Sequence, residues 1–456
     1  MKLRPARYAA RWVLPVTSPP IRDGAVLVDE AGRIAAVGPA ASVPVPEDAE
    51  RIELGEAALL PGLVNVHAHP ELTALRGLLE DLPFHEWIPA LIRAKHEARL
   101  SEEDHAVAAR WTMIEALAAG ITTLAATEDS GAALDALVEA GMRGMVYREV
   151  FGPAPEQAEE SLAALRTKVA AMRARETDRV RVGISPHAPY SVSDRLFQMA
   201  AGYARDEGLP IAIHAAEAEA EELLVRYGKG PFAGGLRTRG IETPPRARST
   251  IALLDRLGVL EARPLLIHCV RVDHEDIRRI ADHGAAVAHC PAANARLGHG
   301  IAPLVELLEA GVTVGLGTDS VASNNRLDIL EEARLAQLFQ RARLRSAGAL
   351  PADRLLRLAT LDGARALGLD SRIGSLEPGK DADLCAVSLV GPHVVPLNDD
   401  PVTAIFHAAR GSDVVLTAVQ GRVLYRDGRV LSLDAERIRP RLEDAANRLA
   451  RARGRT

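Results

Sequence analysis

The sequence LLPGLVNVHAH, residues 59–69, combines a continuous apolar run with a His-Ala-His motif at its end. Further apolar runs rich in Val, Ile, Ala and Leu follow it, separated by longer stretches with helical periodicity. Parallel strands that are buried on both faces have such near-continuous apolar sequences. The eight runs span residues 59–69, 121–128, 142–150, 179–188, 209–217, 264–270, 285–291 and 312–320.

Eight strand-helix repeats are typical of a (β/α)8 barrel of the TIM type, which usually needs about 250 residues. The alternative is an open, doubly wound sheet, which normally has a Gly-rich turn after its first strand. Here the first strand ends in His67 and His69 instead. We therefore predict an α/β fold with a TIM-type barrel over residues 59–369.

The segments that flank the predicted barrel, residues 1–58 and 370–435, are rich in short alternating strands and in turns such as DEAGR, LEPGKDADL and YRDGR. Each segment is short for an independent domain. We expect the two to pair into one small β-domain built from both termini. A C-terminal helix is predicted over residues 436–456.

Charge and cysteine content argue against several classes of function. With 55 Lys and Arg residues against 61 Asp and Glu residues, the net charge of -6 gives no basis for binding nucleic acid or an anionic membrane. The three cysteines are widely spaced and form no CxxC pair, as expected in a reducing cytoplasm. No run approaches the roughly 20 apolar residues of a membrane span. We expect a cytoplasmic protein with a small-molecule substrate, and a homodimer is compatible with this sequence.

Metal-ligating residue types gather at the ends of the predicted strands, where barrel enzymes build their sites. His67 and His69 stand two apart on a strand, so both imidazoles leave the same face. Polar residues also end five later strands: His187, His214, His268, His289 and Asp319. The alternative is that these histidines are structural and bind no metal. That alternative could explain one or two of the positions, but it does not explain why five strands all end in such residues.

We predict that one divalent ion is held by His67, His69, His214 and Asp319. Three imidazoles and a carboxylate suit Zn²⁺, with Fe²⁺ as the alternative, and leave a position for a water whose pKa the ion lowers. The fourth strand ends in Ser185-Pro186-His187, without a lysine that could bridge two metals. A single ion is therefore expected.

Glu217 follows His214 by three residues, close enough to reach the water without binding the ion. Ring deamination needs a proton at the ring nitrogen as water adds, and a nearby carboxylate can deliver it. We predict that Glu217 is this proton shuttle, that Asp319 carries a second proton to the departing ammonia, and that His268 orients the water and stabilises the transition state. The alternative for Glu217 is a carboxylate that only stabilises a helix N-terminus.

Six segments resemble the amidohydrolase superfamily, in particular its chlorohydrolase and purine-deaminase branch: PGLVNVHAH, SPHAPY, HAAE, HCV, HCPAAN and GTDSVASNN. The resemblance implies a metal-dependent hydrolase and gives the same roles to the four ligands and to Glu217 and His268. One departure is Ala293 in HCPAAN, where the family more often has serine, which puts a detail of the substrate pocket in doubt.

Within that branch, ELTALRGLLEDLPFHEWI and YREVFGP are most similar to aminodeoxyfutalosine deaminases, followed by methylthioadenosine/S-adenosylhomocysteine deaminases. Both groups remove the 6-amino group of an adenine carried on a ribose. This resemblance implies that Trp87, Glu97, Arg148 and His187 contact the nucleoside. Core packing is the alternative for Trp87, and a solvated helix face is the alternative for Glu97.

The Gly- and Pro-rich segment 228–249 follows the fifth strand and its short helix on the active-site side, and we expect it to be a lid or a solvated loop. Its cations could pair a carboxylate on the substrate. They are Lys229, Arg237, Arg239, Arg246 and Arg248, against Glu242 alone.

Three other functions remain open. A guanine deaminase or a triazine-type chloro- or aminohydrolase could use the same metal-activated water. A non-catalytic barrel scaffold is the third, but it has no reason to keep the ligands together with Glu217 and His268. The sequence gives no role to His299 or to seven further histidines: His85, His96, His105, His274, His283, His393 and His407.

Overall fold

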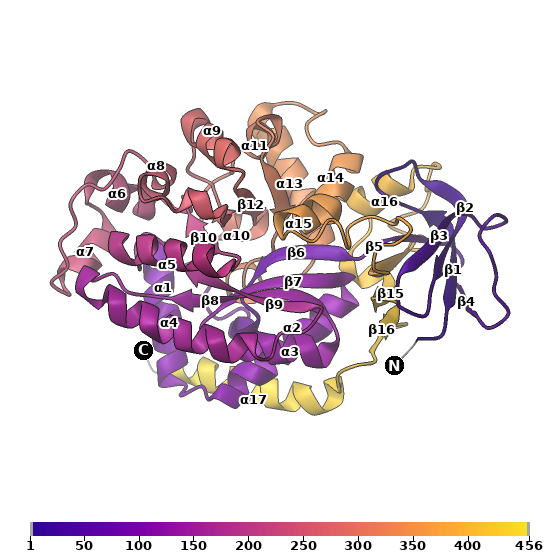
Figure 1. Cartoon of the computed structure of the whole chain (residues 1–456), viewed down its shortest axis with the longest axis horizontal. Helices are drawn as coiled ribbons and strands as arrows, with labels where there is room; N and C mark the ends of the chain where they lie inside the picture. The colour runs from indigo at the N-terminus through magenta and orange to yellow at the C-terminus, as the bar shows by residue number, and fades with distance from the viewer. Residues whose placement is uncertain (1–2, 454–456) are drawn as a thin grey trace.

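The structure, a computed structural model, describes residues 3–453 (Figure 1). Its central part contains eight parallel strands in two sheets of four, one strand within each predicted apolar run. The first sheet contains β6 (Leu63–Ala68), β7 (Ile121–Glu128), β8 (Arg143–Val150) and β9 (Val180–Pro186). The second contains β10 (Ala212–Ala215), β11 (Leu265–His268), β12 (Ala286–His289) and β13 (Thr313–Leu316). The predicted parallel α/β architecture is confirmed at this level.

The two parallel sheets meet at both of their edges. Between β9 and β10, Ile184 forms an isolated parallel bridge with Ile211. Between β13 and β6, the backbone N–H of Asp319 donates to the carbonyl of His67 at 3.0 Å. Continuous strand pairing around a closed barrel is not detected within residues 3–453, so closure stays a prediction.

Helices connect the strands and cover their outer side, as Figure 1 shows. Side-chain caps mark several of their N-termini, for example Asp273 and Asp276, which form a reciprocal capping box at α9 (His274–His283). Gly284, with a φ of 65°, ends the same helix in the left-handed conformation that glycine adopts without strain.

The other helices have the following bounds. Those of the first half are α1 (Phe84–Glu97), α2 (Glu102–Ala118), α3 (Ala132–Ala140), α4 (Ala158–Arg173), α5 (Asp194–Glu207), α6 (Glu219–Tyr227), α7 (Pro231–Arg237) and α8 (Thr250–Arg256). Those of the second half are α10 (Pro291–Arg296), α11 (Leu304–Glu309), α12 (Val321–Asn324), α13 (Ile329–Leu344), α14 (Ala352–Ala359), α15 (Leu361–Ala366), α16 (Pro401–His407) and α17 (Ala435–Arg453). Short 3-10 helices are η1 (Pro70–Leu75), η2 (Pro155–Gln157), η3 (Leu260–Ala262) and η4 (Gly411–Asp413). No helix within the described residues is long and apolar enough to cross a membrane.

Strands from both ends of the chain form one nine-stranded sheet beside the parallel strands (Figure 1). The N-terminal part supplies β1 (Ala6–Val13), β2 (Ile21–Val28), β3 (Ile34–Pro39), β4 (Glu50–Glu53) and β5 (Ala57–Pro61). The C-terminal part supplies β14 (Leu384–Ser388), β15 (Val414–Val419), β16 (Arg422–Arg426) and β17 (Arg429–Val430). The two parts join where β5 pairs antiparallel with β14.

The predicted domain boundaries stay predictions. Residues 1–2 of the predicted β-domain and residues 454–456 of the predicted C-terminal helix lie outside the described residues. The structure divides the first apolar run, because β5 belongs to the terminal sheet and β6 to the parallel one. Gly62 lies between them, and a Cβ atom there would come within 2.1 Å of the Thr122 hydroxyl oxygen. The chain therefore passes closely over β7 at this point.

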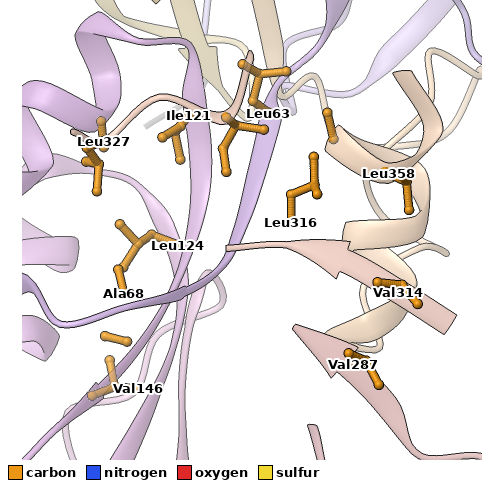
Figure 2. Packing of buried hydrophobic residues seen from close by; sticks show 14 of the residues in the cluster. Leu63, Ala68, Ile121, Leu124, Val146, Val287, Val314, Leu316, Leu327 and Leu358 are labelled. Atoms are coloured by element: carbon orange, nitrogen blue, oxygen red, sulfur yellow. The ribbon is translucent and has the colours of Figure 1, made fainter. Parts of the chain in front are cut away.

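Buried apolar side chains from both parallel sheets pack into one large cluster, part of which is shown in Figure 2. Leu63, Leu124 and Leu316 are fully buried members of this cluster. A buried ion-pair network adds a polar connection to the terminal sheet. Asp381 and Asp383 lie just before β14. Arg143 of β8 donates from Nη2 to Asp381 and from Nε to Asp383, each at 2.9 Å.

Replacing Arg143 by alanine should lower the free energy of unfolding by about 3–5 kcal/mol, because the buried Asp383 would lose its cation and Asp381 would keep only Arg372. Denaturant unfolding measures this change, and Arg195→Ala, which removes an exposed arginine on α5, is the matched control. A loss below about 1 kcal/mol, the range of exposed ion pairs, would contradict the role given to Arg143.

Candidate active site

The four residues predicted to hold a metal come together at the carboxyl ends of the parallel strands. Asp319 Oδ1 lies 3.4 Å from His67 Nε2 and 3.6 Å from His69 Nε2. The ring of His214 on β10 lies 5.0 Å from the ring of His67, measured between centroids. His268 completes a second group, in which ligand atoms of His67, His214 and His268 lie within 4.8 Å of one another.

The carboxylate of Asp319 is held by its own loop. Its Oδ1 accepts from the Ser320 backbone N–H at 2.7 Å, and its Oδ2 accepts from the Ser323 hydroxyl at 2.8 Å. Asp319 has a φ of 58°, a left-handed conformation that is unfavourable for a residue other than glycine. The hydrogen bonds to its side chain and to the His67 carbonyl keep it in this orientation.

The charge states of these residues suit a divalent ion. Burial lowers the pKa of His69 to about 3 and lowers the pKa of His214 well below its usual value, so both rings are neutral near pH 7. Burial alone would raise the pKa of Asp319, but the imidazole of His67, 3.4 Å away, and the other surrounding imidazoles hold it below its usual range. His67 Nε2 is buried without a hydrogen-bond partner among the described residues. Neutral imidazoles and an ionised carboxylate are a fitting donor set for Zn²⁺ or Fe²⁺.

The predicted proton shuttle, Glu217, is buried beside this cluster and lies between two imidazoles. Its Oε1 is 3.4 Å from His268 Nε2 and 3.2 Å from His299 Nε2, and its Oε2 is 3.5 Å from the Tyr190 hydroxyl. Burial favours the neutral acid, but the nearby His268 and His299 lower the pKa of Glu217 overall. His268 Nδ1 lies 2.9 Å from Asn294 Oδ1, which fixes the orientation of the ring.

A cavity of about 600 Å³ opens onto these residues, a volume typical of small-molecule sites. The chain has only six Phe, six Tyr and three Trp residues, and five of these fifteen line the cavity. They are Phe84, Trp87, Phe151, Tyr190 and Phe232. Tyr190 and Phe232 stack with centroids 4.3 Å apart, and the ring of Phe84 meets both edge-on. The cavity therefore has a largely aromatic wall that suits a flat ring system.

Two of the four residues expected to contact the nucleoside line this cavity. Trp87 of α1 and His187 of the β9 end both face it, and His187 Nδ1 is 2.7 Å from the Ser191 hydroxyl. Glu97 is exposed at the C-terminal end of α1 and does not line the cavity. Arg148 is buried near Gly131 and does not line it either.

Two acidic residues that the sequence did not single out take part in the cavity wall. Glu149 faces the cavity because side chains on a strand alternate, so that its neighbour Arg148 points away. Glu71 of η1 lines the same cavity. Glu71 Oε2 and Glu149 Oε1 are buried without hydrogen-bond partners among the described residues. Burial raises the pKa of Glu149 to about 8 and the pKa of Glu71 well above its usual value.

Glu149 could have been found from its position at the end of the third barrel strand, the same signal that marked the predicted ligands. Glu71 follows the first strand end by only a few residues, but nothing in its local pattern separates it from a surface carboxylate. His299 lies in the loop after α10, where hydrophobic periodicity carries no information about the direction of a side chain. Phe84 and Phe232 lie in the first turns of α1 and α7, where an apolar residue is expected to face the interior whether or not it lines a cavity.

Segment 228–249 covers part of the cavity through α7. Phe232, Leu236 and Arg239 line the cavity. The other arginines have partners elsewhere: Arg237 donates to the Gly228 carbonyl, Arg246 to Asp194, and Arg248 to Asp273 and Asp276. Arg239 is therefore the member of the predicted cationic group that faces the cavity, and the lid function stays a prediction.

Removing one of the four predicted ligands should release the ion. His67→Ala should reduce bound zinc or iron from about one ion per chain to a small fraction, because the site loses one of its four protein donors. Elemental analysis of the purified proteins measures this, and His283→Ala, which removes an imidazole paired with Asp255, is the control. Equal metal content in both variants would count against the predicted ligand set.

Comparison with known proteins identifies the family of this chain. A model of the amidohydrolase family matches residues 58–424, and the chain belongs to this family. It is 36% identical over 430 residues to a 5-methylthioadenosine/S-adenosylhomocysteine deaminase of Moorella thermoacetica, covering 93% of this chain and 95% of that protein. It is 35% identical to a 5'-deoxyadenosine deaminase of Methanothermobacter thermautotrophicus, covering 94% and 95% of the two chains. The chain is an enzyme of the hydrolytic deaminase type.

Solved structures show the same fold. A zinc-bound adenosine deaminase from Xanthomonas campestris aligns with a TM-score of 0.85 at 29% identity, over 98% of both chains. An atrazine chlorohydrolase from Arthrobacter aurescens TC1, complexed with zinc, aligns with a TM-score of 0.82 at 25% identity, over 96% and 100%. An aminofutalosine deaminase from Helicobacter pylori, at 22% identity, aligns with a TM-score of 0.79 over 92% and 99% and supports the fold alone.

Proposed function

We propose that this enzyme hydrolytically removes the 6-amino group of an adenine nucleoside. The observation that carries the proposal is the buried carboxylate of Glu217, which lies next to the predicted metal ligands at the aromatic-lined cavity. The sequence relatives are named for deamination of adenine nucleosides, which supports the same substrate class. A flat purine fits between the aromatic side chains, with its amino-bearing carbon toward the ligand cluster.

His67, His69, His214 and Asp319 would hold one ion, for which we propose Zn²⁺, with Fe²⁺ as the alternative. The ion would supply Lewis-acid activation of the attacking water. Glu217 takes one proton from the water and delivers it to the ring nitrogen, so that the aromatic ring can accept the new C–O bond. His268 orients the water, and Asp319 transfers the second proton to the amine, which leaves as ammonia.

For the substituent on the sugar we propose an aromatic, acidic group, as in aminodeoxyfutalosine. Phe84, Phe151 and Phe232 add aromatic surface to the cavity, and the exposed Arg239 offers a cation for a carboxylate. Methylthioadenosine, S-adenosylhomocysteine and 5'-deoxyadenosine form the second candidate group, which the names of the sequence relatives favour.

Two carboxyl groups of the cavity wall, those of Glu71 and Glu149, are suited to form hydrogen bonds with the ribose hydroxyls. Each has an unpartnered buried oxygen, and an unpaired buried polar atom is costly. Apart from the reacting amino group, the ribose hydroxyls are the hydrogen-bond donors that an adenine nucleoside offers. Trp87 and His187 line the same cavity and would contact the base. For Glu97 and Arg148 the proposal of a nucleoside contact now requires movement of α1 or of the β8 end.

Other chemistries fit less well. A halide leaves a triazine ring without being protonated, whereas an amino group must be protonated to leave as ammonia, so the buried Glu217 favours deamination over dechlorination.

We also infer that the two parallel sheets form one closed (β/α)8 barrel, because their edges are connected at β9–β10 and at β13–β6.

A substrate panel tests the proposal. Metal-replete enzyme is incubated with aminodeoxyfutalosine, methylthioadenosine, S-adenosylhomocysteine, 5'-deoxyadenosine, adenosine, guanine and a chlorotriazine, while ammonia or chloride release is measured. We expect kcat/KM to be highest for aminodeoxyfutalosine. A preference for methylthioadenosine would replace the proposed tail but keep the reaction, and chloride release without ammonia would reject deamination.

Arg239 gives a second test of the substrate tail. Arg239→Ala should raise KM about two- to fivefold for an acidic substrate, because it removes one solvent-exposed charge pair of up to about 1 kcal/mol. Methylthioadenosine, which is neutral, should keep its KM. Arg195→Ala, at an exposed site on α5, is the matched control. Equal effects of Arg239→Ala on both substrates would exclude the proposed pairing.

A further inference from the structure

His299 lies in the loop that follows α10, and it faces the proton shuttle. The residue is buried, with 7% of its surface exposed. Its Nε2 atom forms no hydrogen bond with the described residues in this geometry, and Glu217 Oε1 lies 3.2 Å from it. A buried ring N–H needs an acceptor. The carboxylate of Glu217 is the acceptor within reach.

The second imidazole beside Glu217 is engaged differently. His268 Nδ1 faces the side-chain oxygen of Asn294 at 2.9 Å. Because an amide oxygen accepts, Nδ1 carries the proton, and the Nε2 of a neutral ring then has a lone pair. Neutral His268 can therefore accept a proton at Nε2 but cannot donate one to Glu217. A hydrogen bond to Glu217 Oε1 therefore has to be donated by another residue.

The surroundings of His299 hold its ring in place. Its backbone N–H donates to the Asn294 carbonyl at 2.9 Å, which ties the loop to α10. The ring of Phe84 packs edge-on against it, with centroids 4.6 Å apart and planes at 84°. His299 therefore connects Glu217 to the aromatic wall of the cavity as well as to the residue that orients His268.

We propose that His299 is a positioning residue that donates a hydrogen bond from Nε2 to Glu217 Oε1 and so fixes the carboxylate for proton transfer to the substrate ring. This inference rests on the proposed function of Glu217 as the proton shuttle. A misdirected carboxylate slows the proton transfer and leaves the binding of the nucleoside unchanged. The loss of His299 should therefore lower kcat and leave KM nearly unchanged.

Kinetics of two substitutions at this position test the idea. His299→Ala should lower kcat by about tenfold or more with KM changed less than about twofold, because it removes a hydrogen bond to a charged group. His299→Gln, which keeps an N–H donor at a similar reach, should recover most of this loss. A loss that appears in KM, or that glutamine does not recover, would overturn the proposal.

A double-mutant cycle separates positioning from packing against Phe84. In the Glu217→Gln background, His299→Ala should cause little further loss of kcat, because the group that it positions is already disabled. Additive losses would mean that His299 acts through packing alone. His283→Ala, which removes a surface imidazole paired with Asp255 at 3.0 Å, is the matched control, and thermal unfolding of every variant monitors folding.

A measurement without substrate distinguishes this inference from the proposed function. In protein with ¹⁵N-labelled histidine, Glu217→Gln should shift the ring signals of His299 and leave those of His283 in place. If these signals shift but no adenine nucleoside is hydrolysed, the pairing holds and the proposed function fails. Unchanged His299 signals would refute the pairing itself.

Discussion

The buried carboxylate of Asp319 is the constraint on which the rest of the site depends. An isolated negative charge in a protein interior is costly unless hydrogen bonds and positive charge compensate it. Here Ser320 and Ser323 donate to it, and His67 and His69 lie within 3.6 Å. Neutral imidazoles compensate only part of the charge, and a divalent ion between them would supply the remainder. This arrangement requires the strand ends to lie close together. The hydrogen bond from the Asp319 backbone N–H to the His67 carbonyl holds the ends of β6 and β13 together.

The cavity combines two environments with different tasks. Its base is polar, with Glu217 held between His268 and His299, and its wall is largely aromatic. Aromatic side chains exclude water and present flat surfaces at low entropic cost. Exclusion of water strengthens the electrostatic interactions at the base, because the local dielectric is lower there. Proton transfer and recognition of the ring therefore depend on the same enclosure.

Much of this organisation was predictable from local sequence. Each of the eight apolar runs contains a parallel strand, because burial on both faces requires continuous apolar sequence. His67, His214 and Asp319 were predictable as neighbours because the ends of parallel strands meet on one side of a barrel. Glu217 was assigned from its spacing to His214, and in the structure it lies beside His268. The assignment of roles to these residues stays a prediction until the variants are measured.

Sequence by itself therefore determined the parallel strands and the residues at their ends, since both depend on short-range periodicity. Tertiary structure alone decided the rest of the cavity. Glu149 and Arg148 both lie at the end of a predicted strand, but only the packed structure shows that Glu149 is the one that lines the cavity. His299 is separated from Glu217 by 82 positions along the chain, yet the two side chains are in contact. Contacts between connecting segments depend on how the whole chain packs, and local patterns carry no information about them.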